Sequence, residues 1–130
     1  MNIPFCSLDR QHNDLRKMLN SAYDEVLLSG RFILGNEVVI FEEAFAEYVG
    51  VSHCISCANG TDALELILEG MDLLPQAEVI IPDNTWMSVA EAVLRSRAVP
   101  VCCDVLEESQ NLDPAKVRNL ITEKTGAIIV

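Results

Sequence analysis

The chain has 130 residues with 20 acidic and 9 basic side chains, which gives a net charge of −11. This length is enough for one ordinary domain with a buried core. The acidic surplus disfavours nucleic acid and anionic membrane surfaces as partners, because both would repel it. No signal-like segment opens the sequence and no apolar run has the length of a membrane crossing, so we expect a cytoplasmic protein without a membrane contact.

The N-terminal part of the chain has the hydrophobic periodicity of two helices. Apolar residues at helical spacing predict one helix over residues 14–28, and Gly30 is expected to end it. A second set predicts a helix over residues 38–48 that Gly50 ends. Asn36 is the candidate N-cap of this second helix.

From about residue 53 onward, the pattern changes to strands and helices that alternate with short connections. The predicted strands are residues 53–58, 78–81, 99–104 and 125–130, and the predicted helices are 62–69, 85–95 and one that begins at Asp113-Pro114. This order favours right-handed crossovers and a mainly parallel sheet covered by helices. The apolar pattern of the last strand runs to Val130, so we expect an α/β domain that is incomplete at its C-terminus.

The sequence has five cysteines, and Cys54 and Cys57 form a CxxC pattern. A redox pair usually lies at the start of a helix, where the dipole lowers a thiol pKa, whereas these two lie inside an apolar run. A zinc site would need a second ligand pair, and adjacent Cys102 and Cys103 fit the known spacings poorly. We therefore interpret the cysteines as reduced, buried and structural, and we expect no metal site.

Asn59-Gly60-Thr61 lies between a predicted strand and a predicted helix. In open α/β sheets, ligands bind outside the carboxyl ends of the strands, and a helix N-terminus there attracts phosphate. Gly60 would let a phosphate approach the backbone, and the Thr61 hydroxyl could donate a hydrogen bond. The Asp62 carboxylate would repel a phosphate, so we expect it to cap its own helix or contact another group and to leave its N–H for the ligand. The alternative interpretation is an ordinary turn followed by a cap.

The single tryptophan, Trp86, follows the next predicted strand at its carboxyl end. A large flat side chain beside a phosphate site suggests stacking on a planar ring. The alternative interpretation is packing in the core.

Several motifs occur in a fixed order: SGRFILG at 29–35, FEEAFAEYVG at 41–50, NGTDAL at 59–64, EVIIPDNTW at 78–86 and Asp113-Pro114. In this order they resemble motifs in the N-terminal part of the DegT/DnrJ/EryC1/StrS family of pyridoxal-phosphate (PLP) sugar aminotransferases. The resemblance implies the large domain of a fold-type I PLP-dependent transferase, similar to aspartate aminotransferase. Residues 1–50 would be an N-terminal helical segment, and residues 51–130 would be the first part of the PLP-binding large domain.

The resemblance also implies a function and a site. The family usually forms homodimers that move an amino group from an amino acid, glutamate in the usual case, to a keto group of a nucleotide-linked sugar. By this analogy Gly60, Thr61 and the Asp62 backbone would bind the PLP phosphate, and Trp86 would stack on the pyridine ring. Phe32 and Ile33 would border the substrate site, where the sugar lies.

The resemblance places no catalytic residue in this chain, because the family's Schiff-base lysine belongs to a later segment. The lysines present are Lys17 on the first predicted helix, Lys116 on the polar side of the helix that begins at Asp113-Pro114, and Lys124 at the amino end of the last predicted strand, so none is expected to form the Schiff base. A PLP-dependent sugar dehydratase or a non-catalytic homologue of the same fold is the main alternative. A Rossmann-type nucleotide-binding module is disfavoured, because no GxGxxG follows a predicted strand.

Overall fold

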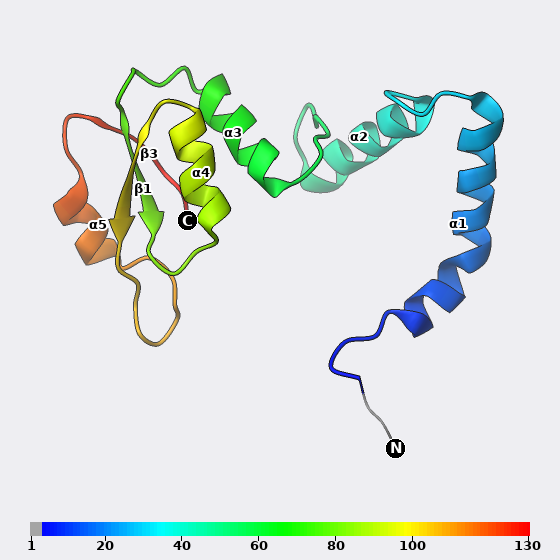
Figure 1. The fold of residues 1–130 in the computed structure, drawn as a ribbon, viewed down its shortest axis with the longest axis horizontal. Helices are drawn as coiled ribbons and strands as arrows, with labels where there is room; N and C mark the ends of the chain where they lie inside the picture. Colours follow the sequence, from blue (N-terminus) through cyan, green and yellow to red (C-terminus); the bar gives the residue numbers. More distant parts are fainter. Residues whose placement is uncertain (1–3) are drawn as a thin grey trace. The chain divides into compact units, whose positions relative to one another are not determined.

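The computed structural model describes residues 4–130, which form two compact units that meet in sequence between Ser56 and Cys57. The first three residues, which belong to the predicted helical segment 1–50, lie outside the described residues. Each unit has its own secondary structure (Figure 1). No helix among the described residues combines the length and the apolar character that a bilayer crossing requires.

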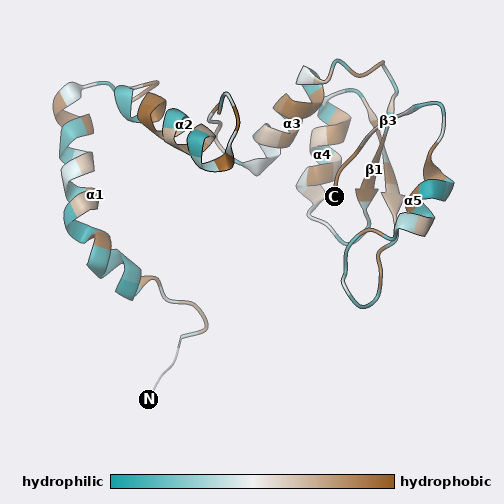
Figure 2. Cartoon of the chain, turned by 180° about the vertical axis from the view of Figure 1, so that it is seen from behind, coloured by the Kyte–Doolittle hydropathy of each residue, from teal (hydrophilic) through white to brown (hydrophobic). Residues whose placement is uncertain are grey.

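The first unit contains the helices α1 (Asp9–Ser29) and α2 (Asn36–Val49). Helix α1 begins before the predicted start, because its first turns are polar and the spacing of apolar residues cannot mark them. Figure 2 shows this polar character as teal along much of α1. Gly30 (φ 64°) and Gly50 (φ 80°) end the two helices in the left-handed conformation, which confirms the predicted ends.

Gly35, not Asn36, is the N-cap of α2, so the prediction for Asn36 is wrong. The Gly35 backbone has the extended conformation of an N-cap (φ −71°, ψ 176°), and its carbonyl accepts a hydrogen bond from the Val38 N–H at 3.2 Å. A Cβ atom at Gly35 would lie 2.9 Å from the Arg31 carbonyl oxygen, which explains why glycine occupies this position.

The predicted strand 53–58 is also wrong, because these residues form no strand. A strand needs a neighbour whose backbone groups complete its hydrogen bonds, and no strand of the described chain pairs with this segment. The segment is held at Ser56 instead. The Ser56 N–H and hydroxyl both donate to Oε1 of Glu42 on α2, each at 2.7 Å.

The second unit is a small α/β fold whose elements follow the predicted order. They are α3 (Gly60–Gly70), β1 (Glu78–Pro82), α4 (Met87–Arg95), β2 (Val99–Cys103), α5 (Pro114–Leu120) and β3 (Thr125–Ile128). The three strands form a parallel sheet, as predicted from the alternation of strands and helices, and their order in the sheet is β2-β1-β3. Asp113 caps α5 by accepting the Ala115 N–H at 2.8 Å, and Pro114 occupies the first turn.

The core of this unit lies between the sheet and the helix pair α3 and α4. Val79 and Ile81 of β1 pack with Leu68 of α3 and with Val89 and Val93 of α4, and all five are buried. Helices α3 and α4 also share an ion pair at the surface. In both Figures 1 and 2, α5 lies on the opposite side of the strands from α4. The sheet is thus covered by helices on both sides, and its carboxyl edge is left to the loops.

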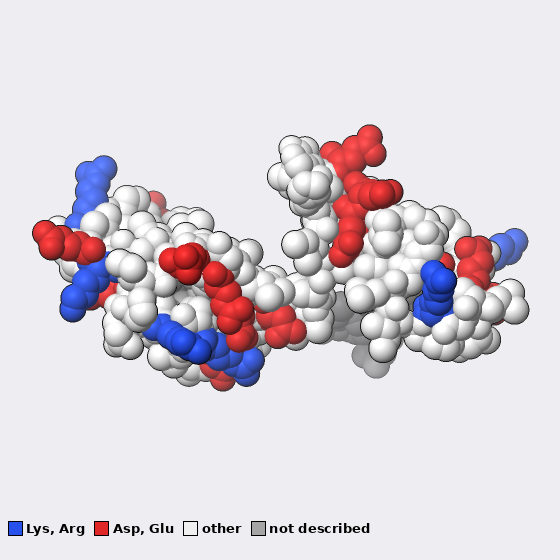
Figure 3. Space-filling view, turned by 90° about the horizontal axis from the view of Figure 1, so that it is seen from above, with Lys and Arg blue, Asp and Glu red and all other residues white. Residues whose placement is uncertain are grey.

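Charged side chains of both signs mix on the surface, as the face in Figure 3 shows. Two pairs in the second unit are close enough to be ion pairs. Arg95 lies 3.3 Å from Glu65, and Lys116 pairs with Asp104. Exposed pairs of this kind contribute little to stability individually.

Candidate functional site

The candidate site begins at the N-terminus of α3, where Asn59 is the N-cap. Its side-chain oxygen accepts the Asp62 N–H at 3.0 Å, and its side-chain nitrogen donates to the Asp62 carboxylate at 3.1 Å. The expectation that Asp62 leaves its N–H for a ligand is therefore wrong. The physical reason is the three-residue spacing, which places the N-cap side chain next to the N–H of the third helical residue.

Two backbone donors of the first turn of α3 stay without an acceptor in the described chain. These are the N–H groups of Gly60 and Thr61, which precede the first residue that can bond to a carbonyl of its own helix. The Thr61 hydroxyl also has no partner among residues 4–130. The first turn thus presents two N–H groups and one hydroxyl at the positive end of the helix dipole.

Gly60 adopts no positive φ, so its backbone conformation does not require glycine. A Cβ atom at Gly60 would meet no heavy atom of the described chain within 4 Å, so packing does not require glycine either. Glycine inside a helix is about 1 kcal/mol less favourable than alanine. A glycine at this position is suited to an anion that must approach the backbone closely.

Trp86 is the N-cap of α4, with an extended backbone (φ −60°, ψ 142°), and it is 84% exposed. The alternative interpretation that the indole packs in the core is therefore wrong. Its backbone carbonyl accepts the Val89 N–H at 3.0 Å and so starts the helix. The helix begins at Met87, later than the predicted Thr85, because residues 83–86 form the turn that leaves β1.

The N-terminus of α3 and the N-terminus of α4, which Trp86 caps, lie toward one end of the second unit. The arrowhead of β1 and the N-terminal ends of α3 and α4 point to the same, lower end in Figure 1. For α4 this arrangement follows from the parallel sheet, because a crossover helix begins where a strand has ended, whereas α3 follows no strand and packs against the same core as α4. The structure thus brings Gly60, Thr61, Asp62 and Trp86 into one unit and toward one edge of its sheet.

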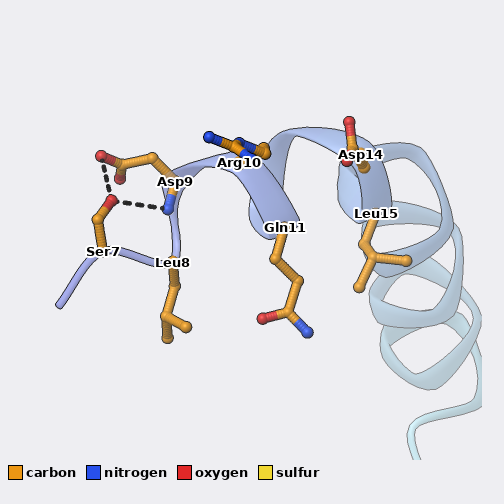
Figure 4. A pocket seen from close by; sticks show the side chains of 7 residues that line it. All are labelled: Ser7, Leu8, Asp9, Arg10, Gln11, Asp14 and Leu15. Atoms are coloured by element: carbon orange, nitrogen blue, oxygen red, sulfur yellow. Dashed lines mark hydrogen bonds between the residues drawn. The ribbon is translucent and has the colours of Figure 1, made fainter.

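The remaining predicted residues lie in the first unit. Phe32 and Ile33 belong to the connection between α1 and α2 and are 68% and 85% exposed. Their role at a substrate site stays a prediction. A hollow near the start of α1 (Figure 4) is lined by one continuous segment, residues 7–11 together with Asp14 and Leu15. In a binding site, side chains from separate elements usually converge, and this hollow is lined by one continuous segment only, so we do not regard it as a candidate site.

The lysines of the chain occupy other places. Lys116 lies near the carboxyl end of β2, but its side chain pairs with Asp104. This hydrogen bond raises the pKa of Lys116 and lowers that of Asp104, so the amine stays protonated. Lys124 lies at the amino end of β3, where its carbonyl accepts the Glu78 N–H at 2.9 Å. Lys17 lies on α1.

The interpretation of the cysteines as buried is correct for Cys103 but wrong for Cys6, Cys57 and Cys102, which are exposed, and Cys54 is half-buried. For Cys54 and Cys57 the reason is the missing strand, because no sheet neighbour covers residues 53–58. All five cysteines are free. Desolvation and the nearby Asp83 raise the pKa of Cys102, and desolvation and Asp113 raise that of Cys103, so neither has the character of a reactive thiolate.

Two features of the site were not predicted from the sequence. The capping role of Asn59 could have been found, because Asn followed three residues later by Asp resembles a capping box. The hydrogen bond between Asn84 and Gln110 joins residues that are 26 positions apart, and no sequence signal marks it.

Solved structures define the class of protein to which this arrangement belongs. The chain superposes on DesV of S. venezuelae in complex with a ketimine intermediate with a TM-score of 0.91 and 37% identity, over 97% of this chain and 34% of that chain. It superposes on NtdA of Bacillus subtilis with bound cofactor PMP with a TM-score of 0.87 and 33% identity, over 95% of this chain and 29% of that chain. The fold is that of the large domain of fold-type I PLP-dependent transferases, as predicted.

Sequence comparison identifies the family. The profile of the DegT/DnrJ/EryC1/StrS aminotransferase family matches residues 13–130, and the chain belongs to this family. A relative from Pseudomonas aeruginosa, UDP-2-acetamido-2-deoxy-3-oxo-D-glucuronate aminotransferase, is 39% identical over 127 residues. The match covers 98% of this chain and 35% of that relative, so the chain spans about a third of the relative's length.

Proposed function

We propose that the protein containing this chain is a PLP-dependent aminotransferase that acts on a keto group of a nucleotide-linked sugar. The family supports this proposal, and so do relatives that are aminotransferases of such sugars. The observation that carries it is the first turn of α3, where free donors and a side-chain-free glycine follow the Asn59 cap. We further propose residues 1–50 and 51–130 as the helical segment and the first part of the PLP-binding domain.

The residues of the site fit PLP. The N–H groups of Gly60 and Thr61 and the Thr61 hydroxyl would bind the phosphate, because the helix N-terminus favours an anion. The Asp62 N–H bonds to Asn59, and the Asp62 carboxylate receives a hydrogen bond from the same residue. The exposed indole of Trp86 would stack on the pyridine ring. When bound, PLP supplies an electron sink for bond breaking at the amino-bearing carbon.

The substrates of the proposed reaction are an amino-acid donor, for which we propose glutamate, and a nucleotide-linked keto sugar. Phe32 and Ile33 would border the sugar, since both are exposed apolar side chains in a short connection. We propose a cytoplasmic homodimer.

The experiment that tests this proposal measures PLP binding and amino transfer by the full-length protein. We expect the absorbance spectrum of PLP to change on binding, and glutamate to be consumed when a nucleotide-linked keto sugar is added. PLP binding without amino transfer to any such sugar would favour a dehydratase or a non-catalytic homologue. Absence of PLP binding would contradict the proposal.

A variant pair tests the role of Thr61 within this proposal. Thr61→Val removes the hydroxyl at nearly constant volume, and we expect PLP affinity to fall about 10- to 150-fold, because a hydrogen bond to a charged group is lost. Thr61→Ser keeps the hydroxyl and should retain most of the affinity. Equal affinities of both variants and the unmodified protein would remove the hydroxyl from the phosphate site.

A further inference from the structure

The turn that carries Trp86 is fixed from outside by two neighbouring segments. Asp83, the first residue after β1, donates its N–H to the Cys103 carbonyl of β2 at 3.0 Å. The next residue, Asn84, donates its side-chain amide to the backbone carbonyl of Gln110 at 3.2 Å and to the Gln110 side-chain oxygen at 3.4 Å. Only Thr85 separates this anchored position from Trp86.

Gln110 is itself held in the loop between β2 and α5. Its N–H donates to the Leu106 carbonyl at 2.9 Å, and its side-chain nitrogen donates to the Glu107 carbonyl at 2.8 Å. An antiparallel bridge between Val105 and Leu112 closes the loop at its base. The loop therefore offers Asn84 an acceptor that is already ordered.

The backbone of Gln110 has a positive φ of 58°, a conformation that glycine adopts without strain and other residues seldom adopt. At this position, both the nitrogen and the oxygen of the glutamine side-chain amide form hydrogen bonds. Its nitrogen bonds to Glu107 within the loop, and its oxygen accepts from Asn84 across to the neighbouring turn. Glycine would make neither bond, so the residue type matches a linking role.

The indole of Trp86 has little packing of its own, since it is 84% exposed. The direction in which the side chain leaves the chain, along the Cα–Cβ bond, is therefore set by the backbone, which is fixed on one side by Asn84 and on the other by the bond from the Val89 N–H to the Trp86 carbonyl. A side chain that must stack on a ring without support from a core needs a rigid backbone, because mobility before binding lowers affinity.

We infer that Asn84 and Gln110 are positioning residues that orient Trp86 for stacking on a planar cofactor ring. We name their two hydrogen bonds the Asn84–Gln110 clamp. The inference rests on the proposed role of Trp86 at the PLP site. Neither residue is expected to contact the ring, and both act through the backbone of the turn.

The test uses the full-length protein with Asn84→Ala and Gln110→Ala, singly and combined. Asn119→Ala is the matched control, because Asn119 is an exposed amide on α5 and makes no side-chain hydrogen bond among the described residues. The first readout is the fluorescence anisotropy of Trp86 without PLP, obtained by subtracting the signal of the same protein with Trp86→Phe. The second readout is the dissociation constant for PLP.

We expect Asn84→Ala to lower the anisotropy of Trp86 and to weaken PLP binding about two- to tenfold, the range of one neutral hydrogen bond. Gln110→Ala should have a smaller effect, because it keeps the backbone carbonyl. The double variant should be no worse than Asn84→Ala, since the two residues form one link. Asn119→Ala should leave both readouts unchanged.

Unchanged anisotropy in Asn84→Ala would overturn the inference. So would a loss of PLP affinity that is equally large when Trp86 is already phenylalanine, because Asn84 would then act without the tryptophan. If the unmodified protein does not bind PLP, the proposed function fails, and the anisotropy measured without PLP still decides whether the clamp orders Trp86.

Discussion

Replacing Gly60 with alanine should change stability and cofactor binding in opposite directions. Gly60 is the first residue of α3, has no positive φ, and has no described atom within 4 Å of where a Cβ would lie. Alanine at such a position should stabilise the protein without PLP by about 0.4–1 kcal/mol, because it restricts the unfolded chain and suits a helix.

The same methyl group would occupy the space where the phosphate is proposed to approach the backbone. Losing one hydrogen bond to a charged group weakens binding by about 1.5–3 kcal/mol. This corresponds to a dissociation constant for PLP that is about 10- to 150-fold higher. Stability can be measured by urea unfolding of the full-length protein without PLP, and affinity by titration with PLP.

Gly70→Ala provides the matched control. Gly70 is the last residue of the same helix, also without a positive φ and without a described atom within 4 Å of where a Cβ would lie. It should give a similar change in stability and leave PLP affinity unchanged. Unaltered PLP affinity in Gly60→Ala would refute the placement of the phosphate, and destabilisation in the absence of PLP would refute the reasoning about open space.

Three further predictions concern the cap, the tryptophan and a carboxylate. Asn59→Ala should destabilise the full-length protein by about 0.5–2 kcal/mol in urea unfolding, because it removes the cap that accepts the Asp62 N–H. Asn59→Ser should largely retain the stability, and equal stabilities of Asn59→Ala and the unmodified protein would contradict the capping role. Trp86→Ala should weaken PLP binding and change the unfolding midpoint little, since the indole is 84% exposed. A large drop in the midpoint with unchanged PLP affinity would show that Trp86 stabilises the fold and does not bind the cofactor. The hydrogen bonds from the Ser56 N–H and, to a smaller extent, from its hydroxyl lower the pKa of Glu42. The ionised carboxylate therefore stabilises the fold at pH values above the ordinary glutamate pKa, and this stabilisation is lost as the pH falls through the lowered pKa of the folded state. Ser56→Ala should therefore raise the pKa of Glu42 in a carboxyl NMR titration, and an unchanged pKa would show that the hydroxyl does not act on it.

The sheet of the second unit was predictable because local pattern and tertiary environment agree. Val79, Ile80 and Ile81 form an apolar run of strand length, and all three are buried at the centre of the sheet between two parallel neighbours. The caps at Gly50 and Asp113 were predictable for a similar reason, since each depends on residues a few positions away. The same short-range information could have identified Asn59 as the cap of α3.

Other features depend on atoms that are distant in sequence. Residues 53–58 have an apolar composition suited to a strand, yet a strand exists only where a neighbour completes its hydrogen bonds, and no described strand does so. The exposure of Trp86 and the contact of Asn84 with Gln110 likewise depend on how the loops at the sheet edge come together. The polar first turns of α1 lack the apolar spacing that would have marked them.

The most direct test of the central claim is a crystal structure of the full-length protein with PLP. We expect the phosphate to lie within hydrogen-bond distance of the Gly60 and Thr61 N–H groups and the Thr61 hydroxyl, with the Trp86 indole parallel to the pyridine ring. A PLP phosphate bound away from the N-terminus of α3 would contradict the account.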